Sequence, residues 1–154
     1  MSLASPRRLP MLFLASAVAV IMVMGAENAS AADPPGPTAI GGQKVLTLVV
    51  RDPPALRCNN NIQVAAELAN IYKVPVVIVP AAFANRGTNA PAVWYGKDLI
   101  AEDGGPQNGM VSFTQIADIL EIENVPKQPQ TGRLTDADVK PKFDALKQQI
   151  KQAP

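Results

Sequence analysis

Two short apolar runs, KVLTLVV at 44–50 and VPVVIV at 74–79, frame a stretch with helical periodicity. Each run is dense in β-branched and aliphatic residues, which is typical of a buried strand. Apolar residues recur at helical spacing over 62–72, and one of the three asparagines at 59–61 is expected to cap this helix. A strand, a helix and a strand joined so closely form a βαβ unit, which predicts parallel strands and a right-handed crossover. The fold class is therefore α/β.

Two further elements follow the βαβ unit. After Pro91 the chain reads AVWYGKDLIA, which predicts two strands joined by a tight turn at Gly96 and Lys97. The segment SFTQIADILEIEN begins with Ser112 and has Gln115 three residues later, the pattern of a capping box at the start of a helix. The tail from 135 onward predicts one more short helix, either packed over the domain or loosely attached.

The N-terminal 31 residues have the pattern of a secretory signal peptide, because two arginines precede an apolar run at 12–24 and the triplet Ala29, Ser30, Ala31. The alternative is an uncleaved anchor that faces the same compartment. Either way we expect a periplasmic or secreted protein, with a membrane contact only through this segment. The predicted organisation is a signal peptide at 1–31, a flexible lead-in rich in Pro and Gly at 32–43, one domain at 44–126, and a linker with the C-terminal helix at 127–154.

The composition excludes several classes of function. The chain has 14 basic and 13 acidic residues, without the basic stripe of a nucleic-acid binder. It contains no histidine, which excludes triads that pair Ser or Cys with His. The single cysteine, Cys58, cannot form an internal disulfide. It is therefore a buried thiol, an intermolecular partner or a reactive group.

The order of strand, cysteine-bearing loop, helix, strand, proline loop, hairpin and capped helix resembles the thioredoxin-like family over about 44–125. The resemblance implies a cis proline at Pro91, with Ala90 beside the active thiol. Members that exchange disulfides have two cysteines separated by two residues, whereas this chain has one. In one register Cys58 stands at the second cysteine position and Ala55 replaces the nucleophile. In the other, Cys58 is the nucleophile at the helix tip and Asn61 replaces the resolving cysteine.

The resemblance leaves two uses for the site. A thiol at a helix N-terminus is favoured as thiolate, and Arg57 would add to this if its side chain turned inward. Without a resolving partner, however, exchange needs an external thiol. We therefore expect a binding or accessory module, without a cofactor, that recognises a partner protein or peptide beside Cys58 and Pro91; its oligomeric state is left open. The candidate residues are Cys58 as a catalytic nucleophile in the alternative of a monothiol oxidoreductase or isomerase, and Arg57, Asn59, Asn61, Ala90 and Pro91 for binding.

A second alternative is metal trafficking through surface carboxylates. Asp98, Glu102 and Asp103 are oxygen ligands of the kind that bind hard cations. Their spacing does not match a calcium loop, which favours a solvated turn. No metal ligand is therefore assigned.

Overall fold

The computed structural model describes Met1 and residues 33–152. The predicted signal peptide therefore lies, apart from Met1, outside the described residues. Within the described part of the chain, none of the helices is both long and apolar enough to cross a membrane.

The described elements confirm the predicted α/β class. In chain order they are β1 (Ala39–Ile40), β2 (Gln43–Lys44), β3 (Leu46–Val50), α1 (Leu56–Ile71), β4 (Val76–Pro80), the 3-10 turn η1 (Ala81–Phe83), β5 (Ala92–Tyr95), β6 (Asp98–Glu102), α2 (Phe113–Ile122), the 3-10 turn η2 (Arg133–Thr135) and α3 (Lys140–Gln152).

Four strands form a mixed sheet in the order β4-β3-β5-β6. β3 and β4 are parallel and are joined by α1, so the predicted βαβ unit is confirmed. β5 runs antiparallel to both β3 and β6, which confirms the predicted hairpin around Gly96. This topology brings the carboxyl end of β3, the start of α1, the start of β5 and the end of β6 to one edge of the sheet.

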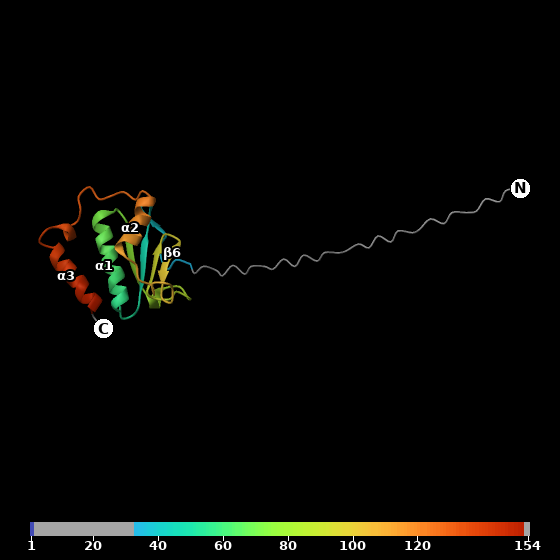
Figure 1. Cartoon of the computed structure of the whole chain (residues 1–154), viewed down its shortest axis with the longest axis horizontal. Helices are drawn as coiled ribbons and strands as arrows, with labels where there is room; N and C mark the ends of the chain where they lie inside the picture. Colours follow the sequence, from blue (N-terminus) through green and yellow to red (C-terminus); the bar gives the residue numbers. More distant parts are fainter. Residues whose placement is uncertain (2–32, 153–154) are drawn as a thin grey trace. The chain divides into compact units, whose positions relative to one another are not determined.

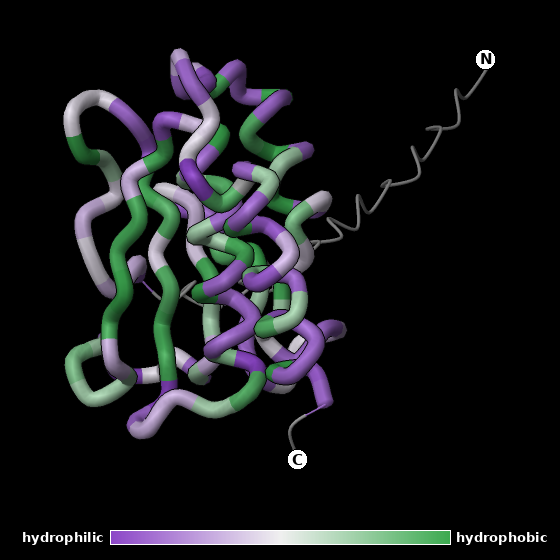
Figure 2. Tube along the Cα trace, turned by 90° about the vertical axis from the view of Figure 1, so that its left-hand side faces the viewer, coloured by the Kyte–Doolittle hydropathy of each residue, from purple (hydrophilic) through white to green (hydrophobic). Residues whose placement is uncertain are grey.

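The sheet is covered by helices on one face and by loops on the other. Toward the helices, Leu48 and Val93 of the sheet pack with Leu68 of α1 and Ile116 of α2 in the main core. On the opposite face, Trp94 belongs to a smaller cluster that is covered by alanines from η1 and its flanking loop. In Figure 2 the strands are mostly green, whereas the turns that lead to the C-terminus are mostly purple. Apolar side chains are thus packed on both faces of the sheet, in a larger core under the helices and a smaller cluster under the loops.

α3 packs against α1 on the side away from the sheet (Figure 1). None of its residues is buried, and its apolar face is narrow. The ion pair between Lys147 Nζ and Glu67 Oε1, at 2.6 Å, joins the two helices. The C-terminal helix is therefore packed on the domain and is not a loosely attached tail.

The N-terminus of α1 and the segment at 32–43 differ from what the sequence predicted. The asparagines at 59–61 do not cap α1, because the Asn59 N–H already donates to the Ala55 carbonyl at 3.0 Å, an ordinary helical hydrogen bond. Ala55 is instead the N-cap, and its extended backbone follows the two prolines. The segment expected to be a flexible lead-in contains the hairpin of β1 and β2, turned by Gly41 and Gly42, which both have positive φ.

Of the two hydrogen bonds in the predicted capping box at the start of α2, the structure has one. Ser112 Oγ accepts from the Gln115 N–H at 3.1 Å. The return bond of a capping box is not formed, because Gln115 Oε1 is buried without a hydrogen-bond partner among the described residues.

Candidate functional site

Cys58 lies inside α1 rather than at its tip. The helix begins at Leu56, so Cys58 is in its first turn, and its side chain is 0% exposed. Ala55, three residues earlier, is exposed at the tip. The observed helix start fits the register in which an exposed Ala55 precedes Cys58 by three residues, the register that the resemblance links to a lost nucleophile. This burial argues against the catalytic assignment of Cys58, because a nucleophilic thiol must itself reach the sulfur of an external disulfide.

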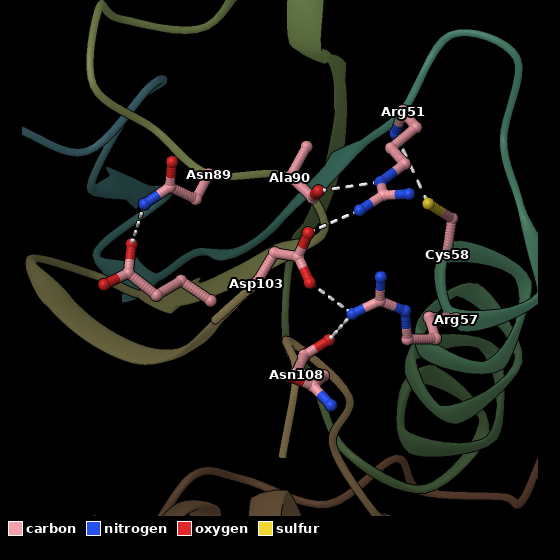
Figure 3. A network of polar contacts seen from close by, with 8 residues as sticks. Arg51, Arg57, Cys58, Asn89, Ala90, Asp103 and Asn108 are labelled. Carbon is pink, nitrogen blue, oxygen red and sulfur yellow. Dashed lines mark hydrogen bonds and ion pairs between the residues drawn. The ribbon is translucent and has the colours of Figure 1, made fainter. Parts of the chain in front are cut away.

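The thiol of Cys58 also takes part in the hydrogen bonding of the neighbouring chain. The backbone N–H of Arg51, directly after β3, donates to Cys58 Sγ at 3.3 Å (Figure 3). This bond connects the end of the central strand to the first turn of α1. The sulfur therefore acts as a small buried acceptor at the junction of two elements.

Two arginines converge on one carboxylate at the edge of the sheet. Arg51 leaves the end of β3, Arg57 comes from the first turn of α1, and each forms an ion pair with one oxygen of Asp103, which follows β6 (Figure 3). Hydrogen bonding by Arg57, and then by Arg51, lowers the pKa of Asp103 below its ordinary value of 3.8. Two positive charges face one negative charge, so this group carries a net positive charge at neutral pH.

Arg51 also contacts the backbone beside the predicted proline. Its Nε donates to the Ala90 carbonyl at 2.9 Å. The Ala90–Pro91 bond is cis, as the resemblance implied, and Pro91 is buried whereas Ala90 is half-buried. Ala90, Pro91 and Arg57 are thus brought together with the first turn of α1, as expected from the sequence. Arg51 completes the group, and we call the exposed surface of Arg51, residues 52–55, Arg57 and Ala90 the loop surface.

Asn61 does not belong to the loop surface. Its side chain is 1% exposed, Nδ2 donates to the Gly109 carbonyl at 2.7 Å, and Oδ1 accepts from the Val111 N–H at 3.0 Å. Asn60 makes a similar contact, donating to the Val111 carbonyl at 2.9 Å. The expected binding role of Asn61 is therefore corrected to a structural one, because both ends of its amide hold the loop before α2. Asn59 is half-buried and makes no side-chain hydrogen bond to the described residues.

Replacing Asn61 by Ala should destabilise the domain. It would leave the Gly109 carbonyl and the Val111 N–H without partners in a buried place, and each such group costs about 1–3 kcal/mol. We expect a loss of about 2–5 kcal/mol in the free energy of unfolding by urea denaturation. Asn59→Ala is the matched control, and we expect it to change stability by less than about 1 kcal/mol. Equal losses in the two variants would contradict the structural role of Asn61.

The acidic residues considered as cation ligands do not converge. Asp103 pairs with the two arginines, Glu102 accepts from Asn89 Nδ2 at 3.4 Å, and Asp98 lies 3.8 Å from Lys44 Nζ. Among the described residues there is no cluster of three or more acidic, cysteine or histidine side chains that could hold a metal ion. Each of these carboxylates therefore has a positively charged or amide neighbour in place of a shared centre.

Sequence reasoning missed Arg51 and the role of Asp103. Arg51 directly follows a central strand, and the ends of the strands in an open α/β sheet are where ligand-binding residues gather, so its place was a usable signal. The pairing itself has no local signal, because Arg51 and Asp103 are 52 residues apart. Phe83 in η1 was also missed; it is 79% exposed and belongs to the loop that covers the sheet beside Ala90.

Comparison with known proteins adds no relative: no protein-family model, curated protein or solved structure matches this chain.

Proposed function

We propose that this chain is an exported, thioredoxin-like binding module that uses the loop surface to hold an extended segment of a partner protein. One observation carries the proposal: the only thiol is buried in the first turn of α1, and an alanine occupies the exposed tip of that helix. The order of strands and helices along the chain, with a parallel βαβ unit followed by a hairpin and a helix, supports the proposal. A domain of this kind keeps a surface for recognition after losing the chemistry of a dithiol.

The arginines of the loop surface select the partner's chemistry. Arg51 and Arg57 each direct part of the guanidinium to Asp103 and to a backbone carbonyl, Ala90 or Asn108. A guanidinium has several N–H donors in one plane, so both groups retain donors for a further acceptor. Asp52 also belongs to the loop surface, so the surface together with Asp103 is neutral, and its preference for a carboxylate rests on the remaining guanidinium donors of Arg51 and Arg57. We therefore propose that the bound segment carries Asp or Glu side chains.

The two alternative functions gain no support. A monothiol oxidoreductase needs Cys58 to meet a disulfide, which its burial prevents in the folded state. Metal trafficking needs carboxylates that share a cation, and Asp98, Glu102 and Asp103 have other neighbours.

Binding can be tested with two labelled pools of extended peptides, identical except that Asp and Glu in one pool are Asn and Gln in the other. We expect the acidic pool to bind more tightly and to weaken as salt rises, because the attraction is screened. Arg57→Gln should reduce affinity by at least about tenfold, since a charge-assisted hydrogen bond contributes about 1.5–3 kcal/mol. Fluorescence anisotropy measures each affinity.

Two variants serve as controls. Arg133→Gln removes an arginine with an 89% exposed side chain on η2, outside the loop surface, and should leave binding unchanged. Cys58→Ala should also retain binding, because the thiol does not reach the surface. Equal affinity for the two pools, or equal losses from Arg57→Gln and Arg133→Gln, would reject the proposed surface.

A further inference from the structure

A groove lies between α3, α1 and the chain that leads into α2. Its cavity has a volume of about 500 Å³. This is within the range of pockets that bind small molecules, about 300–1,000 Å³. The groove exists because α3 packs on α1 without burying any of its own residues.

The floor of the groove is apolar. It is lined by Val64 of α1, by Met110 and Val111 in the loop before α2, and by Phe113 at the start of α2. Val64 and Val111 also belong to the buried core, so this floor is rigidly supported. Such a lining favours a hydrocarbon chain or ring.

The rim of the groove is positively charged. Lys147 and Lys151 of α3 line it, and no acidic residue does. Lys147 is paired with Glu67, whereas Lys151 has no ion pair with the described residues. The first turn of α2 also contains no acidic residue, and its backbone N–H groups add positive potential at the same end.

The neighbouring cavity on the other side of Lys147 provides an internal contrast. It has a volume of about 390 Å³ and shares Phe113 and Lys147, but Glu67, Asp144 and a second lysine, Lys140, line it as well, so its charges balance. Acidic side chains repel an anion, so of these two cavities only the first combines an apolar floor with a rim that has no acidic lining residue and one lysine, Lys151, without an ion pair to the described residues.

We propose that the groove of Val64, Met110, Val111, Phe113, Lys147 and Lys151 binds a free amphipathic anion, with one apolar chain on the floor and a carboxylate at Lys151. The carboxylate lies at the rim, where water keeps it solvated, and the chain displaces water from the apolar floor. The ligand bridges α3 to α1 and α2, so its binding stabilises the packed position of α3. This site is independent of the proposed peptide recognition.

Calorimetric titration of the full chain with decanoate tests the site, with two related probes beside it. Decyltrimethylammonium has the same chain with the opposite charge, and acetate has the carboxylate without the chain. We expect decanoate to bind at a single site and both other probes to bind at least about tenfold more weakly. Comparable binding of decyltrimethylammonium would overturn the proposal, because the positive rim would then play no part.

Variants of α3 locate the site. Lys151→Gln should weaken decanoate binding about two- to fivefold, the range expected for one partly exposed ion pair. Lys142→Gln is the matched control, since Lys142 is an exposed lysine of the same helix that does not line the groove. Equal affinity of these two variants would overturn the assignment of the carboxylate to Lys151.

Two further measurements are independent of these substitutions. In nuclear magnetic resonance spectra of the unaltered chain, decanoate should shift the amide signals of Phe113 and Thr114 more than those of the loop surface. Shifts confined to the loop surface would contradict the proposal. Binding to phosphatidylglycerol vesicles without binding to free decanoate would also overturn it, because the rim would then serve a membrane surface.

Discussion

Gly109→Ala should destabilise the domain by about 3–4 kcal/mol, because that position has no room for a side chain. A Cβ added at Gly109 would lie 2.1 Å from the Pro91 carbonyl oxygen and 3.0 Å from the Asp103 backbone nitrogen. The φ angle of Gly109 is +74°, which further strains an L-residue. The backbone around Pro91 and Asp103 cannot move away without breaking the contacts between the arginines and Asp103.

Gly104→Ala is the matched control for this substitution. Gly104 also has a positive φ, +84°, but nothing lies within 4 Å of an added Cβ. Gly104→Ala should therefore lower the free energy of unfolding only through the strain of an alanine at positive φ, by about 1 kcal/mol. Urea denaturation followed by circular dichroism gives both values. Equal losses would mean that the close approach of Gly109 to Pro91 does not occur, and would remove the structural support for the loop surface.

Periodicity and turn residues were sufficient for most of the fold. The runs that became β3 and β4 are almost entirely apolar, and the hairpin of β5 and β6 is marked by Gly96. The start of α2 was found because its cap is local: Ser112 bonds to the backbone three residues on. In each case the signal and the structure lie within a few residues of each other.

The first turn of α1 could not be located in the same way. The residues LRCNNN lack an apolar repeat, and three asparagines in a row are typical of a cap. The side chains of Asn60 and Asn61 instead bond to the loop about 50 residues away, at Gly109 and Val111. Long-range hydrogen bonds of this kind override local capping preference and leave no trace in the spacing.

The sequence did contain a local signal for the hairpin of β1 and β2, but the high Pro and Gly content of the segment favoured a flexible chain instead. The pair Gly41 and Gly42 stands between two short segments, which is a recognised hairpin turn. The pairing of the site residues had no such local signal: Arg51, Arg57 and Asp103 meet only because the sheet brings the ends of β3 and β6 together.

The proposed binding role depends on the burial of the Cys58 thiol, and alkylation of the folded chain tests that burial. A thiol that reacts only when the domain opens is protected by the free energy of opening, and each 1.4 kcal/mol of that energy slows the reaction about tenfold. For a domain with an ordinary stability of at least about 5 kcal/mol, we expect alkylation in native buffer to be at least about a thousandfold slower than in denaturant.

The control moves the only thiol to the position of Ala55, at the exposed N-terminus of α1. In the double variant Ala55→Cys, Cys58→Ser, the only cysteine stands at the exposed tip of α1 and should react in native buffer about as fast as a free thiol. We expect slow alkylation of the wild-type chain and fast alkylation of this variant. Rapid alkylation of Cys58 in the folded wild-type chain would contradict this expectation and would restore the thiol as a candidate nucleophile.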